Sequence, residues 1–367
     1  MKQVKIQQYE LSGSYYEIGR QEARRIASEQ MHILPPKHFS DESMEEALEC
    51  YKMFCPGLLE ELRGFSDESG IPMEEMAYTW MTYLVPRCSG LAINGGLMED
   101  GHTRILRNYE FGIDEEDMTI CKTSVSGKYA HIGGTVVCFG RSEGINEKGL
   151  AISMSSCGMP VSNMEGMRAP EVKGLQFWAV IRTLLEECKD VEEAIDLMNT
   201  LPVGYNINLY LADANGTVAL YETINGHNAY EIKDASSNQY VFGTNHIAIK
   251  ELQQYEPFGM KNSVIRYENI EKFMQMKGKK TEKELFDFAL TPYPQGITCF
   301  QYQMYMGTIK TIVMDANERR FTICWMGQKT NGFQNYYVSD TIEPCSKLVE
   351  YEEQLAEPDM FFMQPLN

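Results

Sequence analysis

A cysteine followed by a tight hairpin is the sequence feature that most constrains the fold of this chain. Cys88 comes after an apolar run, and two short alternating segments follow it, at 89–94 and 103–109. Gly-Gly at 95–96 and Asp-Gly at 100–101 mark turns between the two segments, which is typical of a β-hairpin. The sequence therefore predicts a cysteine at the start of one strand, with the next strand running antiparallel beside it.

The second strand of this hairpin ends in polar residues that suit a reactive thiol. The run Arg107-Asn108-Tyr109-Glu110 would place a guanidinium, an amide and a carboxylate beside the first strand. A thiol becomes a thiolate at neutral pH when a cation lies nearby, and it needs a base to take its proton. Cys88 is therefore the candidate nucleophile, and Arg107 is the candidate cation.

Strands and pairs of helices alternate along the whole chain. Before the cysteine, a strand is expected at 4–11 and helices at 14–33, 41–55, 56–69 and 73–84. After the hairpin, strands are expected at 120–125, 131–138, 150–155, 207–212, 218–223, 308–314 and 321–325, and helices at 174–200 (split near 189), 263–276 and 281–290. Mostly hairpin connections favour an antiparallel α+β protein. The tail from Glu343 is expected to form a closing helix and a strap.

Composition and charge exclude several classes of function. The 367 residues carry a net charge of −19, which argues against a nucleic acid or an anionic membrane as partner. No apolar run approaches the ~18 residues of a membrane span, and residues 1–14 lack a secretory signal pattern. The ten cysteines show no CxxC spacing, which favours free thiols in a reducing cytoplasm over a metal site. We expect a cytoplasmic protein with no metal and no cofactor, and the sequence is compatible with a homo-oligomer.

Four stretches in sequence order resemble the acyl-coenzyme A:6-aminopenicillanic acid acyltransferase-like family and, less closely, the choloylglycine hydrolases. They are the cysteine with its hairpin, 143–150 (EGINEKGL), 243–246 (GTNH) and 262–266 (NSVIR). The segment GSYYEIGRQEA also resembles the region before the nucleophile in the first family. Both families are N-terminal-nucleophile (Ntn) hydrolases. The resemblance implies a four-layer αββα sandwich at 88–367, with a mostly helical pro-segment at 1–87 packed on it.

The resemblance also implies roles for individual side chains. Asn245 would donate a hydrogen bond to the tetrahedral oxyanion, and Ser156 would contact the oxyanion or the substrate. Arg266 would stabilise the site. Glu110 would hold and orient the α-ammonium of the cysteine.

A cut in the chain before the cysteine is a further implication of the resemblance. Cleavage of the Arg87–Cys88 bond would free an α-amine with an unperturbed pKa of ~7.7–8, which can act as the base for the thiol. The expected substrate is a small linear, non-peptide amide with an apolar acyl group. The reaction would pass through an acyl-cysteine thioester, released to water or to a second amine.

Two positions depart from the family pattern and keep alternatives open. Glu110 stands where aspartate is usual, and Arg87 stands where glycine often precedes the cysteine. Glycine tolerates the strained backbone that self-cleavage needs. One alternative is therefore a non-processing relative used as a binding scaffold. The other is a peptidase that acts on dipeptides.

Overall fold

Two large β-sheets form the centre of the molecule. The computed structural model describes residues 2–29, 41–73, 87–136, 138–159 and 171–366. In these residues one sheet has ten strands, a second has seven, and a third has two. Their neighbouring strands are antiparallel, with the one exception of β1 beside β4.

The first sheet runs in the order β11-β10-β9-β8-β7-β5-β4-β1-β18, with the short β6 paired to β5. Its strands are β1 (Lys2–Gly13), β4 (Thr119–Val125), β5 (His131–Val136), β6 (Gly140–Arg141), β7 (Glu143–Asn146), β8 (Ala151–Ser156), β9 (Ile207–Ala212), β10 (Val218–Ile224), β11 (His227–Lys233) and β18 (Cys345–Tyr351). Every residue of β8, β9 and β10 is buried. The middle of this sheet is therefore covered on both faces.

The second sheet runs in the order β12-β2-β3-β15-β16-β17, with β14 paired to β15. Its strands are β2 (Ser89–Ile93), β3 (Arg104–Phe111), β12 (Tyr240–Gly243), β14 (Phe300–Gln301), β15 (Met306–Asp315), β16 (Arg320–Trp325) and β17 (Phe333–Tyr337). The predicted hairpin is confirmed, since β2 and β3 pair with Ser89 opposite Asn108 and Gly90 opposite Arg107. Two further strands, β13 (Phe258–Met260) and β19 (Met363–Pro365), pair with each other.

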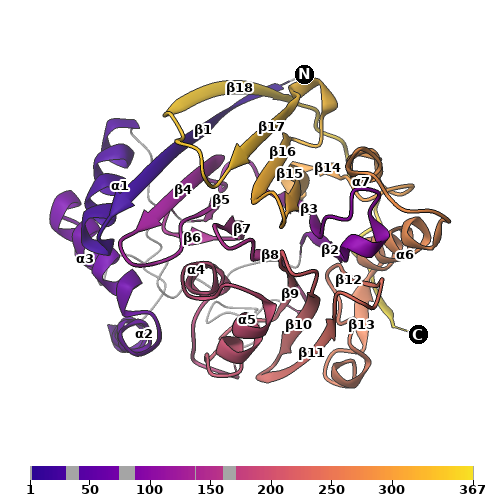
Figure 1. Cartoon of the computed structure of the whole chain (residues 1–367), viewed down its shortest axis with the longest axis horizontal. Helices are drawn as coiled ribbons and strands as arrows, with labels where there is room; N and C mark the ends of the chain where they lie inside the picture. Colours follow the sequence, from indigo (N-terminus) through magenta and orange to yellow (C-terminus); the bar gives the residue numbers. More distant parts are fainter. Residues whose placement is uncertain (1, 30–40, 74–86, 137, 160–170, 367) are drawn as a thin grey trace.

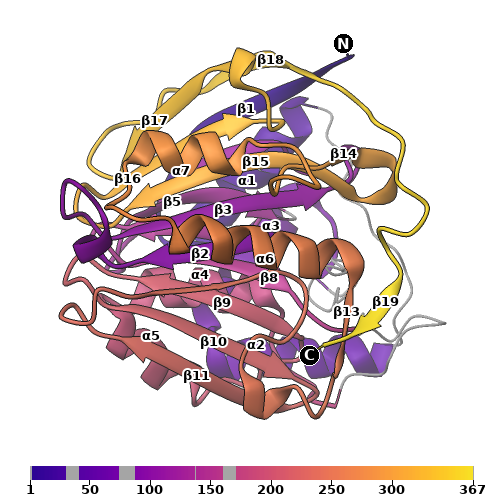
Figure 2. The same ribbon diagram turned by 90° about the vertical axis from the view of Figure 1, so that its right-hand side faces the viewer.

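Helices lie outside both sheets. They are α1 (Tyr15–Glu29), α2 (Asp41–Phe54), α3 (Pro56–Ser69), α4 (Phe177–Glu187), α5 (Val191–Met198), α6 (Lys261–Gln275) and α7 (Glu282–Ala289). Figure 1 shows α1 to α5 on one side of the stacked sheets, and α6 and α7 on the other. Figure 2 shows α6 and α7 lying across the second sheet. The predicted αββα order of layers is therefore confirmed.

Three apolar clusters fill the spaces between these layers. The first joins α1 to α5 to the first sheet, and the third joins α6 and α7 to the second sheet. The middle cluster lies between the two sheets and contains Cys88, Ile120, Ile312 and Trp325. The candidate nucleophile therefore lies in the layer between the sheets, within a packed apolar cluster.

The N-terminal segment contributes more than helices. β1 lies inside the first sheet, parallel to β4 and antiparallel to β18. The expected closing helix after Glu343 is wrong, because in the described residues this tail forms β18, a turn and β19. Antiparallel pairing of Cys345–Tyr351 with β1 satisfies the backbone groups of this part of the tail. The helix expected at 73–84 lies, from residue 74 on, outside the described residues.

A buried ion pair fastens the N-terminal segment to the rest of the molecule. Arg182 on α4 contacts Glu61 on α3 at 2.6 Å and Glu186 at 2.8 Å, and the three side chains are 1–2% exposed. Glu61→Leu is expected to lower the free energy of unfolding by about 3 kcal/mol, because it leaves a buried guanidinium with one carboxylate fewer. Urea unfolding measures the change.

The neighbouring Glu60 provides the control for this prediction. Its pair with Arg63 is nearly half exposed on both sides, so Glu60→Leu is expected to change the free energy of unfolding by less than about 1 kcal/mol. Equal effects of the two substitutions would show that the buried pair does not stabilise the contact between α3 and α4.

Candidate active site

Cys88 lies immediately before β2 with an unusual backbone conformation. Its φ is +83°, a left-handed value that costs a non-glycine residue of the order of 1–3 kcal/mol. The side chain is 3% exposed. Arg107 on β3 donates from Nη2 to the sulfur at 3.4 Å, and the thiol lies 3.9 Å from the carbonyl oxygen of Glu110. The sequence prediction that the hairpin brings Arg107 to the thiol therefore agrees with the geometry.

The Arg107 charge and burial act in opposite directions on the pKa of this thiol. Burial raises the pKa of the Cys88 thiol, and the Arg107 guanidinium opposes the rise. In the uncut chain the site is therefore closed to water and carries one cation directly on the sulfur.

Ser156 contacts the backbone of Arg87, the residue that precedes Cys88. It lies at the end of β8 in the first sheet, so this contact crosses between the two sheets. The backbone N–H of Arg87 donates to Ser156 Oγ at 2.9 Å, and the same hydroxyl lies 3.5 Å from the Arg87 carbonyl oxygen. The phenol of Tyr205 is also hydrogen-bonded to Ser156. The Ser156 hydroxyl thus lies beside the Arg87 carbonyl, the group that the Cys88 thiol would attack in the expected self-cleavage.

The Arg87 side chain is buried against the turn at 302–305. Its Nε donates to the Tyr305 carbonyl at 2.5 Å and its Nη2 to the Met304 carbonyl at 2.8 Å, and the guanidinium lies 5.1 Å from the centre of the Phe361 ring. Burial, with a contribution from Arg266, lowers the pKa of Arg87 to about 10. The residue before the cysteine is therefore fixed by contacts on its side chain.

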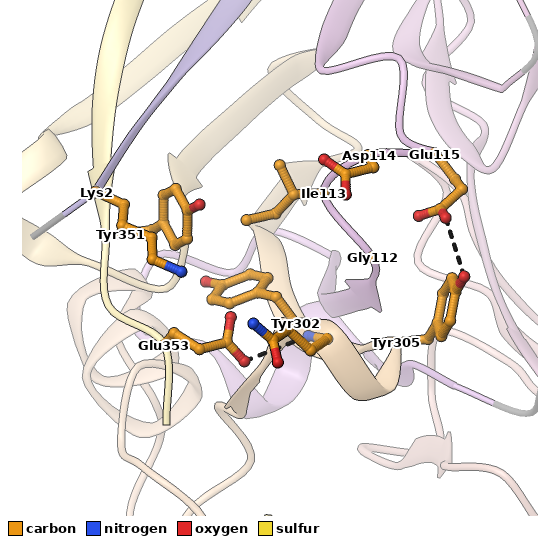
Figure 3. Close-up of a pocket in the computed structure, with 10 residues that line it drawn as sticks. Lys2, Gly112, Ile113, Asp114, Glu115, Tyr302, Tyr305, Tyr351 and Glu353 are labelled. Carbon is orange, nitrogen blue, oxygen red and sulfur yellow. Dashed lines mark hydrogen bonds between the residues drawn. The ribbon is translucent and has the colours of Figure 1, made fainter. Parts of the chain in front are cut away.

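The same turn lines a small polar cavity. The cavity has a volume of about 170 Å³. Figure 3 shows Tyr302 and Tyr305 from the turn, with Asp114, Glu115 and Glu353 around the space. The Tyr305 hydroxyl donates to Glu115 at 2.9 Å.

Arg266 connects the remaining predicted residues. It extends from α6 and donates to the Cys88 carbonyl at 3.0 Å, to Asn245 Oδ1 at 2.5 Å and to Asn262 Oδ1 at 3.0 Å. Asn245 donates from Nδ2 to the Ser156 carbonyl at 2.9 Å. The amide of Asn245 is therefore oriented from both ends, next to the residues that flank the Arg87–Cys88 bond.

The two carboxylate oxygens of Glu110 differ in their hydrogen bonds. Thr308 donates to its Oε1 at 2.9 Å, while Oε2 lies 3.8 Å from Arg266 Nη1 and has no hydrogen-bond partner in the described parts of the chain. The side chain is fully buried. Burial raises the pKa of this carboxyl, and Arg266 acts against the rise. A buried oxygen without a partner can accept a new donor at low cost.

None of the four described histidines hydrogen-bonds to the thiol. His246 lies in the matched Gly-Thr-Asn-His segment, and its Nδ1 lies 2.8 Å from Ser263 Oγ. Burial lowers the pKa of His246 to about 4, so the ring is neutral at physiological pH. His102 is at the far end of the hairpin, 2.9 Å from Asp315. These two side chains do not offer the thiol a base.

Sequence reasoning missed a second group of charges behind the thiol. Arg107 Nη1 lies 2.5 Å from Glu143, and Glu143 lies 3.3 Å from Lys310, which in turn lies 2.9 Å from Glu116. A signal was present, because Lys310 is a lone cation in the apolar strand MGTIKTIVMD. No local pattern connects it to Glu143, which lies far earlier in the sequence, on β7.

A family model described as Acyl-coenzyme A:6-aminopenicillanic acid acyl-transferase matches residues 97–330. This range covers well over half of the chain. The chain belongs to this family. The predicted class of enzyme, an amidohydrolase or acyltransferase of the Ntn type, is thereby confirmed. Membership of the acyl-transferase family rests on residues after Cys88, since the match begins at residue 97, within the turn of the hairpin.

Solved structures similar to this acyl-transferase family member share little sequence identity with it. Penicillin V acylase from Agrobacterium tumefaciens is 16% identical with a TM-score of 0.43, over 65% of this chain and 83% of that chain. A variant of conjugated bile acid hydrolase from Clostridium perfringens is 13% identical with a TM-score of 0.42, over 74% and 99%. The Caenorhabditis elegans ortholog of N-acylethanolamine-hydrolyzing acid amidase is 14% identical with a TM-score of 0.39, over 63% and 93%. No curated protein sequence matches the chain.

The described residues also bear on membranes and metals. Across them, no helix is long and apolar enough to cross a membrane. In the same residues, no group of three or more histidine, cysteine, aspartate or glutamate side chains could hold a metal ion.

Proposed function

We propose that this chain is a cysteine amidohydrolase or acyltransferase that acts on small linear amides through a thioester on Cys88. In this proposal residues 1–87 are a pro-segment and residues 88–367 are the catalytic domain. The observation that carries the proposal is the surroundings of the Arg87–Cys88 bond. A cation touches the thiol and a hydroxyl touches the carbonyl, while the cysteine holds a strained φ.

The first reaction of the chain is its own cleavage. The sulfur of Cys88 attacks the carbonyl carbon of Arg87, the bond from that carbon to the Cys88 nitrogen breaks, and the thiol proton passes to that nitrogen. Ser156 Oγ donates to the oxygen that becomes negative, since it already lies 3.5 Å from it. Water then opens the thioester, which leaves a carboxylate on Arg87 and a free amine on Cys88.

The new amine supplies the base that the thiol otherwise lacks. It takes the proton of the Cys88 sulfur, and Arg107 stabilises the resulting thiolate. The buried Oε2 of Glu110 receives the ammonium. A new cation beside this carboxylate also favours its charged form, against the burial that now raises its pKa.

Amide cleavage then follows on the same atoms. The thiolate attacks the substrate carbonyl, Asn245 donates to the oxyanion, and the ammonium of Cys88 gives its proton to the leaving amine. The acyl group stays on sulfur until water or a second amine attacks with help from the Cys88 amine. An apolar acyl group on the substrate remains a prediction from the family resemblance.

The proposal is tested by trapping the thioester. The protein is mixed with a panel of amides (penicillin V, a conjugated bile acid and an N-acylethanolamine), quenched in acid within the first turnover, and weighed by mass spectrometry. For an amide that is turned over, we expect the mass of its acyl group on the chain that begins with Cys88. Turnover without such an adduct, or an adduct on another residue, would contradict the assignment of the nucleophile.

A further inference from the structure

A chain of alternating charges leads from the thiol into the space between the sheets. Arg107 contacts the sulfur of Cys88 on one side and Glu143 on the other. Lys310 then lies between Glu143, at 3.3 Å, and Glu116, at 2.9 Å. The order from the sulfur is therefore cation, anion, cation, anion, and the four charges sum to zero.

These four side chains are sealed from water. Arg107, Glu143 and Lys310 are fully buried, and the side chain of Glu116 is 3% exposed. They come from four places in the sequence, namely β3, β7, β15 and the loop after β3. Charges are taken out of water only when each has a close partner. The arrangement is therefore a single unit in which a change at one member alters the field at the others.

The backbone around the unit leaves room for it. Gly134 on β5 faces the pair of Glu143 and Lys310, and a Cβ at that position would overlap Glu143 Oε1 and lie 2.5 Å from Lys310 Nζ. Tyr109 completes the far end, since its hydroxyl donates to Glu116 at 2.6 Å and its ring lies 4.1 Å from Lys310 Nζ.

We propose that Lys310 is a positioning residue for the nucleophile, because it balances Glu143 and so leaves the charge of Arg107 available to the Cys88 thiolate. The inference rests on the proposed function, in which that thiolate is the nucleophile. Without Lys310, the charge of Glu143 would be offset by Arg107 alone, and the Cys88 thiolate would be less stabilised. Without the charge of Glu116, Lys310 would add its field to that of Arg107, and the Cys88 thiolate would be more stabilised.

Other charged groups around the thiol are fixed by contacts outside this unit. Those that face it are Glu110 on β3, Arg87, and Arg266 on α6, with Tyr109 and Tyr205 as neutral phenols. Lys310 is faced by Glu116, Glu143, Arg107 and Tyr109. Substitutions at Lys310 and Glu116 therefore change the field at the sulfur while Glu110, Arg87 and Arg266 stay in place, and Glu116→Gln keeps an acceptor for the Tyr109 hydroxyl.

The test is the rate of iodoacetamide alkylation of Cys88 against pH, resolved by peptide mapping of the purified protein with both of its segments present. At a pH below the thiol pKa, the rate follows the thiolate fraction, which falls about tenfold when that pKa rises by about 1. We expect Lys310→Met to slow alkylation of Cys88 about three- to tenfold and Glu116→Gln to speed it by a similar factor. Lys310→Arg keeps the cation and should restore most of the rate. The exposed Cys345 is the internal control, and its rate should not change.

Opposite changes in the alkylation rate of the two variants distinguish this role of Lys310 from a purely structural one. Loss of packing would change the alkylation rate of Cys88 in the same direction in both variants, and that outcome would overturn the proposal. Unchanged rates in both variants would also overturn it. If Lys310→Met does not fold, the isosteric Glu116→Gln still decides, because a slower or equal rate contradicts the inference. The assay needs no turnover, so the inference can fail while a self-cut, active enzyme upholds the proposed function.

Discussion

Cys88→Ala is expected to leave the chain in one piece of 42.0 kDa and to abolish cleavage of amides. Alanine has no atom that can attack the Arg87 carbonyl, so the bond stays intact. It also has no atom that can carry the acyl group. Removal of a nucleophile that acts in a covalent mechanism lowers kcat by about 10⁴-fold or more. The substitution removes one buried sulfur, and we expect the fold to be retained.

Denaturing electrophoresis and an amidase assay on the same preparation measure both effects. Cys345→Ala is the matched control, since Cys345 is exposed and lies on β18. It should be cut and active like the wild-type chain. A Cys88→Ala protein that still cuts itself, or that still hydrolyses an amide at more than about a hundredth of the wild-type rate, would remove Cys88 from the mechanism.

Asn245→Ala is expected to lower kcat on a responsive amide by about 10²-fold or more, as for the loss of one oxyanion donor. The amide of Asn245 lies between Arg266 Nη2 and the Ser156 carbonyl. It is therefore held in one orientation before substrate arrives. The loss should fall on kcat more than on KM, because the hydrogen bond forms fully with the charged oxygen of the transition state.

Steady-state kinetics with an exposed asparagine as control test this effect. Asn228 on β11 is exposed, and Asn228→Ala should leave kcat and KM at wild-type values. Thermal unfolding of both variants shows whether the fold is kept. A folded Asn245→Ala protein with wild-type kcat would exclude Asn245 from the oxyanion site.

Local patterns in the sequence predict the parts of this molecule that depend on neighbouring residues. The glycine turns place β2 against β3, so the meeting of Cys88 with Arg107 follows from the hairpin alone. Helices α2 and α3 were expected at 41–55 and 56–69 and lie at Asp41–Phe54 and Pro56–Ser69, because Pro56 can begin a helix but cannot continue one. The approach of Asn245, Ser156 and Arg266 to that hairpin came from the family resemblance, since periodicity does not report contacts between distant strands.

Other features depend on pairings that no local pattern encodes. β1 reads as a strand, but its place between β4 and β18 is fixed only when residues near 120 and 348 fold against it. The unit formed by Arg107, Glu143, Lys310 and Glu116 is missed for the same reason. A lone lysine in an apolar strand is a usable signal, because a buried cation requires an anion nearby, but the sequence does not say which anion.

Arg87 also behaves differently from what its residue type suggests. Its departure from glycine favoured a chain that does not process. In the structure, however, the left-handed φ falls on Cys88 and not on Arg87. The Arg87 guanidinium is held by two carbonyls of the turn at 302–305. Residue 87 therefore has no positive φ that would call for glycine, and a large side chain there is compatible with the proposed cut.

The central claim is that the working base is the α-amine of Cys88, and one measurement tests it most directly. Intact mass and N-terminal sequencing of the purified wild-type protein are followed over time together with its amidase activity. We predict that two chains of about 10 and 32 kDa appear, since the 42.0 kDa chain divides at residue 87 of 367. The larger chain should begin Cys-Ser-Gly-Leu, and activity should rise in proportion to the cut fraction. A chain that turns over amides while the Arg87–Cys88 bond is intact would contradict the account.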